Sequence, residues 1–70
     1  MILVVGATGH LGTAVCKRLV REGYPVRALV RPGSSYRHLS TMGVELMLGD
    51  LQDIDSVRAA CRDVTYTGVP

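Results

Sequence analysis

Three glycines spaced three residues apart follow an apolar run at the start of the chain, and together they could hold an anion. The run Ile2–Val5 leads directly into Gly6, Gly9 and Gly12. Gly6 permits a tight turn, Gly9 lets the backbone approach an anion closely, and Gly12 lets the following helix pack against the strand. The amide groups of that helix's first turn, from His10 onward, would point at the anion. The alternative is a glycine-rich turn that binds no ligand.

A basic residue stands where a dinucleotide-binding fold reads the ribose. Arg31 follows the second apolar run, and no Asp or Glu occurs between Glu22 and Glu45. An acidic residue at this place would favour NAD, whereas a guanidinium can pair with the 2′-phosphate of NADP. We therefore expect NADP, with NAD less favoured. Arg37 is a second candidate for this phosphate, although an Arg at an exposed helix start needs no ligand.

Asp50 and Leu51 follow the third apolar run, at the end of a strand where ligands of parallel sheets bind. The Asp50 carboxylate could accept a hydrogen bond from an adenine amino group, and Leu51 could offer an apolar surface. Asp50 could equally cap the next helix. No catalytic residue and no metal site are predicted, and His10 is expected to lie in the loop without acting as an acid or base.

The elements that would position these residues alternate along the chain. Strands are predicted at Ile2–Val5, Val26–Val30 and Val44–Leu48, with a fourth possible from Val64. Three helices are predicted. The first covers residues 10–22, with Leu11, Ala14, Val15 and Leu19 on its apolar face, and the second covers residues 36–42. The third begins after Asp50, with Asp53 or Asp55 at its cap and apolar residues recurring to Val64. The alternation predicts an α/β, Rossmann-like parallel sheet in the order βαβαβα, incomplete as a single partial domain over residues 1–70.

Composition excludes several other classes. The 70 residues carry a net charge of only +2, and the basic residues are scattered, so nucleic acid is not an expected partner. Cys16 and Cys61 lack the spacing of a metal or redox pair and are predicted to be small core residues. No apolar run is long enough to span a membrane, so we expect a cytoplasmic protein. Open sheet edges could allow self-association.

Three motifs in this order resemble a known family. They are Gly6-Ala-Thr-Gly-His-Leu-Gly12, Val26-Arg-Ala-Leu-Val-Arg31 and Gly43-Val-Glu-Leu-Met-Leu-Gly-Asp50-Leu51. They are similar to the amino-terminal third of atypical short-chain dehydrogenase/reductases, in the NmrA-like and isoflavone-reductase-like branch that binds NAD(P)H. The resemblance implies a Rossmann fold and a set of cofactor contacts. The implied contacts are the pyrophosphate over Thr8, Gly9, His10, Leu11 and Gly12, the 2′-phosphate at Arg31 and Arg37, and the adenine near Asp50 and Leu51.

The chain also departs from this family. Members are three to four times longer, and active ones carry a Tyr-x-x-x-Lys pair or another catalytic Lys later in the chain, whereas Lys17 is the only Lys here. The tail after Val64 is a poor match for the family's fourth strand. We expect the NADP(H)-binding part of an oxidoreductase that moves hydride to or from a small organic substrate, with the catalytic part absent. The alternative is a non-catalytic module that senses NAD(P) or acts as a scaffold.

Overall fold

Four parallel strands form one sheet in a computed structural model that describes residues 1–68. The strands are β1 (Ile2–Val5), β2 (Val26–Val30), β3 (Glu45–Leu48) and β4 (Tyr66–Gly68). They lie in the order β3-β2-β1-β4. The helices are α1 (His10–Arg21), α2 (Arg37–Ser40) and α3 (Ile54–Ala60). The predicted α/β parallel fold is confirmed, and the short fourth strand is formed.

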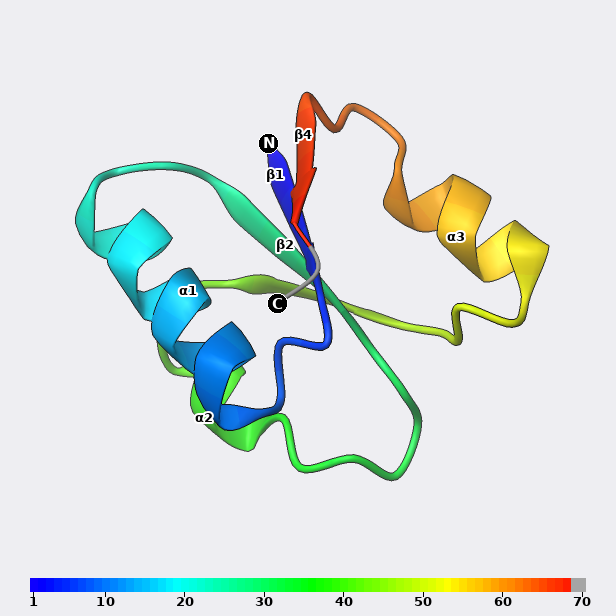
Figure 1. Cartoon of the computed structure of the whole chain (residues 1–70), viewed down its shortest axis with the longest axis horizontal. Coiled ribbons are helices and arrows are strands. Elements are labelled where there is room, and N and C mark those ends of the chain that lie inside the picture. Colours follow the sequence, from blue (N-terminus) through cyan, green and yellow to red (C-terminus); the bar gives the residue numbers. More distant parts are fainter. Residues whose placement is uncertain (69–70) are drawn as a thin grey trace.

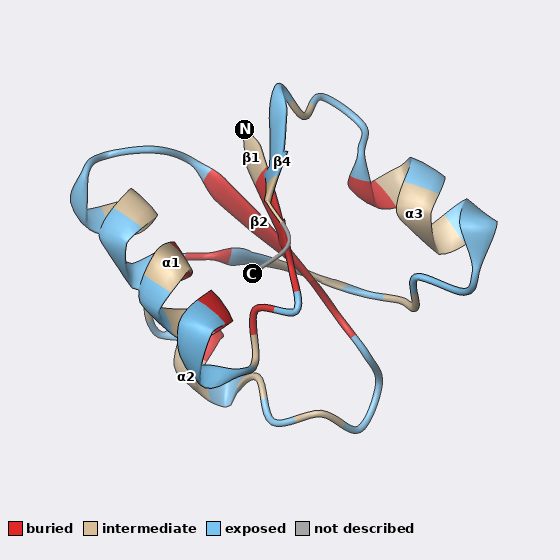
Figure 2. Cartoon of the chain, in the orientation of Figure 1, coloured by how far each residue is buried: buried red, intermediate tan, exposed pale blue. Residues whose placement is uncertain are grey.

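The two central strands are buried because helices cover both faces of the sheet. Figure 1 shows α1 and α2 on one side of the sheet and α3 on the other, and Figure 2 shows that burial is greatest along β1 and β2. All five residues of β2 are buried. Largely apolar runs are typical of strands covered on both faces, and Ile2–Val5 and Val26–Val30, which is apolar except at Arg27, were predicted with their observed bounds.

Helix α1 packs on the sheet through small residues. Gly12 and Cys16 are buried, with Val15 and Leu19 partly buried beside them. Burial raises the pKa of the Cys16 thiol by desolvation. The predicted apolar face was wrong at its outer side, because Leu11 is 63% exposed and Ala14 is also exposed. Packing turns the helix so that Cys16, Val15 and Leu19 face the core while Gly12 lies against the loop at Gly6 and Ala7.

The carboxyl end of α1 is fixed by backbone hydrogen bonds. The Gly23 amide donates to the Val20 carbonyl at 3.0 Å, and the Tyr24 amide donates to the Leu19 carbonyl at 3.1 Å. Gly23 has a φ of +88°, the left-handed backbone conformation that is common in a glycine just after the end of a helix. The helix ends at Arg21 with Glu22 as its cap, one residue before the predicted end.

Helix α2 is shorter than the predicted 36–42 and covers four residues. The Ser40 hydroxyl donates to the Arg37 carbonyl and the Thr41 hydroxyl donates to the His38 carbonyl, both at 2.8 Å. Such side-chain bonds to preceding carbonyls compete with helix continuation. Gly43, with a φ of +85°, then turns the chain into β3, which begins at Glu45 and not at the predicted Val44.

Helix α3 is held against the sheet by a buried arginine. The Arg27 Nη1 atom donates to the carbonyls of Ala60 at 2.8 Å and Arg62 at 2.6 Å, and its Nε lies 3.4 Å from Glu45 Oε1. The helix ends at Ala60, well before Val64, and Arg27 binds carbonyls at and just beyond that end. Cys61 follows as its cap and is exposed, so the prediction of Cys61 as a core residue was wrong.

Strand β4 pairs with the free side of β1, with Ile2 opposite Tyr66 and Val4 opposite Gly68. Its weak apolar character did not prevent pairing, because the β1 backbone supplies the hydrogen bonds. Over residues 1–68, no helix combines the length and the apolar character needed to cross a membrane.

Candidate functional site

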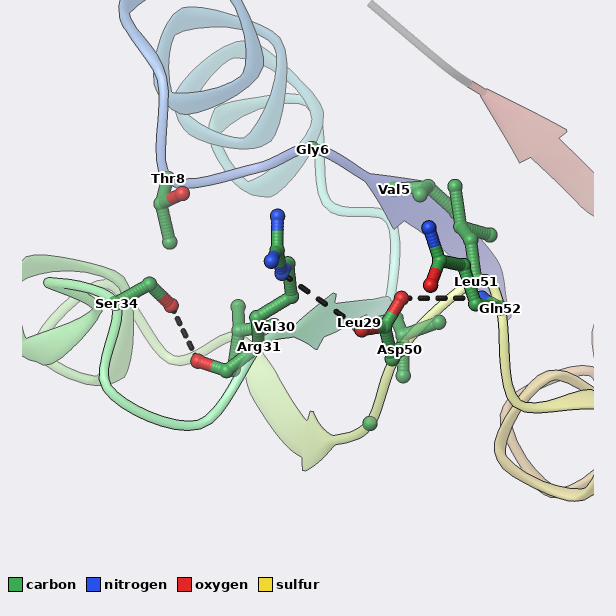
Figure 3. Close-up of a pocket in the computed structure, with 11 residues that line it drawn as sticks. Val5, Gly6, Thr8, Leu29, Val30, Arg31, Ser34, Asp50, Leu51 and Gln52 are labelled. Atoms are coloured by element: carbon green, nitrogen blue, oxygen red, sulfur yellow. Dashed lines mark hydrogen bonds and ion pairs between the residues drawn. The ribbon is translucent and has the colours of Figure 1, made fainter.

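A cavity of about 330 Å³ opens at the carboxyl ends of β1, β2 and β3 (Figure 3), and we call it the strand-end cavity. Its lining comes from these strand ends and the loops after them. It consists of Val5, Gly6, Thr8, Leu29, Val30, Arg31, Ser34, Gly49, Asp50, Leu51 and Gln52. Cavities of this size and position take small ligands in open parallel sheets.

The glycine loop forms one wall of the site, and the physical reason for a glycine differs from one position to the next. Gly6 has a φ of +75°, which favours glycine at the turn after β1. A Cβ on Gly12 would lie 2.7 Å from Ala7 Cα and closer still to the Gly6 carbonyl oxygen. Only glycine therefore lets α1 start this close to the loop.

Gly9 is not required by the fold itself. Its φ is −76°, and an added Cβ would meet only the Gly6 carbonyl oxygen at 3.9 Å, an ordinary contact. Gly9 caps α1 without a side-chain hydrogen bond, and the first turn contains no acidic residue. The first amides of a helix lack partners within it, so this start is open to an external anion.

Arg31 and Asp50 face one another across the strand-end cavity. Figure 3 shows the Arg31 side chain pointing from the end of β2 toward the loop with Gly6, with Asp50 beside it. Arg31 Nε lies 3.9 Å from Asp50 Oδ2, and the side chains are 78% and 42% exposed. The pairing arises because β2 and β3 end together, with Val30 opposite Leu48 and the Gly49 amide donating to the Val30 carbonyl.

The structure decides how Asp50 relates to α3. Asp50 Oδ1 accepts a hydrogen bond from the Gln52 amide at 3.0 Å, which closes a turn in the loop. The helix cap is Asp53, which accepts from the Asp55 amide at 3.1 Å. The alternative in which Asp50 caps the helix is therefore wrong, and the cap expected at Asp53 or Asp55 is Asp53.

Eight of the ten predicted contact residues line three hollows. The strand-end cavity is lined by Gly6, Thr8, Arg31, Asp50 and Leu51. Beside it, a depression at the start of α1 is lined by Thr8, Gly9, His10, Thr13, Ala14, Lys17 and His38. Arg37 lines a separate depression that shares Ser34 with the cavity. Leu11 and Gly12 line none of these three hollows, since Leu11 points to solvent and Gly12 is buried.

The sequence did not single out several lining residues. Val5, Leu29 and Val30 give the cavity an apolar wall, and Gln52 lies beside Asp50. Gly49 permits the loop to pack closely, since an added Cβ would lie 2.7 Å from Ser56 Cβ and 2.9 Å from Leu29 Cδ1. Each lies in the last two residues of a predicted strand or in the loop after one, which is the signal that could have marked it.

The arrangement suits a ligand with an apolar part and a phosphate. Apolar side chains supply surface for a flat ring, Arg31 supplies a cation, and the glycine loop leaves space for an anion. No three His, Cys, Asp or Glu side chains of residues 1–68 come together as a metal would need.

Two known proteins resemble this chain in sequence. The chain is 44% identical over 62 residues to sterol demethylase protein B of Methylococcus capsulatus, covering 89% of this chain and 19% of that protein. It is 42% identical over 60 residues to an NAD(P)H azoreductase of Xenophilus azovorans, covering 86% and 21%. The chain thus spans about a fifth of the length of these relatives.

A solved structure shares the fold. The NADPH-dependent quinone oxidoreductase QOR2 of Escherichia coli superposes with a TM-score of 0.85 at 28% identity, covering 99% of this chain and 26% of that one. The model of the NmrA-like family matches residues 1–67. With the three motifs, the parallel sheet and the glycine loop in agreement, this chain belongs to the NmrA-like family.

Proposed function

We propose that this chain binds NADP(H) for an oxidoreductase that transfers hydride between the cofactor and a small organic substrate. The observation that carries the proposal is the strand-end cavity, in which a glycine loop and Arg31 flank an apolar wall. Membership of the NmrA-like family and relatives named as NAD(P)H- and NADPH-dependent reductases support a nicotinamide dinucleotide as the ligand.

Each part of the cofactor has a proposed partner. The pyrophosphate lies over the start of α1, at Thr8 to Gly12, where the helix offers free amides. The adenine lies against the apolar wall near Asp50 and Leu51, and the 2′-phosphate pairs with Arg31. Arg37 lies in the adjoining depression and makes a weaker, second contact with that phosphate.

The dinucleotide supplies the hydride when bound, and this chain holds and orients it. Among the described residues that line the strand-end cavity, none is a Tyr, Lys or His that could serve as an acid in carbonyl reduction. We propose that the catalytic groups and the substrate pocket lie outside residues 1–70.

Arg31→Ala is expected to weaken NADP binding about tenfold or more while changing NAD binding little, because a charge-assisted contact with the 2′-phosphate is lost. Calorimetric titration of the purified protein with both cofactors at fixed salt measures this. Arg21→Ala is the matched control, since it removes the same charge from an exposed residue at the other end of α1. Equal losses for NADP and NAD in the Arg31 variant would contradict the assignment.

A further inference from the structure

The strand-end cavity contains two opposite charges, and only one of them suits a phosphate. Among the described residues that line it, Arg31 and Asp50 are the two charged ones. Their ion pair, with Nε and Oδ2 3.9 Å apart, uses the same guanidinium to which we assign the 2′-phosphate. A phosphate that binds Arg31 must therefore displace the Asp50 carboxylate or share the guanidinium with it.

The Asp50 carboxylate is held in this position by its own loop. Its Oδ1 atom accepts from the Gln52 amide at 3.0 Å, which leaves Oδ2 directed at Arg31 (Figure 3). The Gly49 amide donates to the Val30 carbonyl at 2.9 Å and fixes the start of the same loop against β2. The loop thus holds one oxygen of the Asp50 carboxylate and leaves the other near Arg31.

The strength of this pair sets the size of its effect. Both side chains are partly exposed, and an exposed ion pair changes an equilibrium constant by only about fivefold or less. A doubly charged phosphate can displace such a partner, but part of its attraction to Arg31 is offset by the pair it breaks and by repulsion from the carboxylate.

We propose that Asp50 determines cofactor specificity in opposition to Arg31, by forming an ion pair that competes with the 2′-phosphate and limits the preference for NADP over NAD. This inference rests on the proposed binding of NADP(H) and names a second residue that sets its selectivity. A contact between Asp50 and the adenine is common to both cofactors and cancels when they are compared.

The test compares the affinities for 2′-phospho-ADP-ribose and ADP-ribose, and we call their quotient the 2′-phosphate ratio. Asp50→Asn keeps an oxygen that can accept from the Gln52 amide and removes the charge. We expect the variant to raise the ratio about three- to fivefold, in line with an exposed ion pair. Asp55→Asn is the matched control, because it removes an exposed charge from the start of α3 outside the cavity and should leave the ratio unchanged.

The same substitution in an Arg31→Ala background shows whether Asp50 acts through Arg31. We expect the rise in the ratio to be much smaller there, because no pair remains to be broken. An unchanged or lower ratio in Asp50→Asn, or an equal rise in both backgrounds, would overturn the inference while leaving the proposed function standing. Failure of the unaltered protein to bind either ligand would overturn the proposed function as well. If Asp50→Asn does not fold, Asp50→Ser, which can also accept from the Gln52 amide, replaces it.

Discussion

At the scale of single residues, Gly9 and Gly12 occupy similar places in the motif but are needed for different reasons. Gly12 is required by the protein, because a Cβ would overlap the backbone of the loop. Gly9 has an ordinary φ and open space at its Cβ position. If Gly9 is needed, the reason is a ligand that approaches the backbone.

Alanine substitutions should separate these two reasons. Gly12→Ala is expected to lower the free energy of unfolding by about 1–3 kcal/mol, because overpacking forces the helix away from the loop. Gly9→Ala should change that free energy by less than about 1 kcal/mol yet weaken ADP-ribose binding about tenfold. Urea denaturation and calorimetry measure the two quantities. A Gly9 variant that binds as tightly as the unaltered protein would argue against a phosphate at this loop.

At the scale of secondary-structure elements, the amino-terminal ends of α1 and α3 contrast. Helix α3 is capped by the Asp53 side chain and has Asp55 in its first turn. Helix α1 starts at Gly9 with neither a side-chain cap nor an acidic residue in its first turn. At α3, these two carboxylates supply a hydrogen-bond acceptor and negative charge to the start of the helix. At α1, the start of the helix remains available to an anion from outside the chain.

Removal of the α3 cap should affect stability alone. Asp53→Ala is expected to lower the free energy of unfolding by about 0.5–2 kcal/mol, since the Asp55 amide loses its acceptor. The 2′-phosphate ratio should stay constant, because Asp53 does not line the strand-end cavity. Urea denaturation and calorimetry on one preparation provide both values, and a changed ratio would mean that the position of α3 controls the cavity.

Elements whose signal is local were predicted well from the sequence. The apolar runs of β1 and β2 have the bounds observed, and the strand–glycine loop–helix order led to Arg31 and Asp50. The end of α2 was missed because the Ser40 and Thr41 hydroxyls bond to earlier carbonyls. The sequence pattern shows where polar residues occur but not which carbonyl each one will reach.

Features set by tertiary packing were harder to predict. Leu11 and Cys61 both have apolar helical spacing, yet each is exposed, because α1 packs on the core through Cys16, Val15 and Leu19 and α3 ends early at Ala60. The hydrogen bonds of Arg27 to the carbonyls of Ala60, at the end of α3, and Arg62, just beyond it, join residues more than 30 positions apart, and no local pattern indicates them.

At the scale of the whole molecule, strand order brings the site together. The order β3-β2-β1-β4 puts the ends of β1, β2 and β3 side by side, so that the glycine loop, Arg31 and Asp50 surround one cavity. The order in which strands are added to the sheet reverses at β1, because β2 and β3 lie on one side of it and β4 lies on the other. Ligands of open α/β sheets bind at such a switch point, which agrees with a dinucleotide across these strand ends.

The most direct test of this account is a calorimetric titration of the purified protein with 2′-phospho-ADP-ribose and with ADP-ribose at one salt concentration. Both ligands should bind, because both carry the pyrophosphate and adenine, and the 2′-phosphorylated ligand should bind more tightly through Arg31. Binding of neither ligand, or tighter binding of ADP-ribose, would contradict the proposal that this chain holds NADP(H).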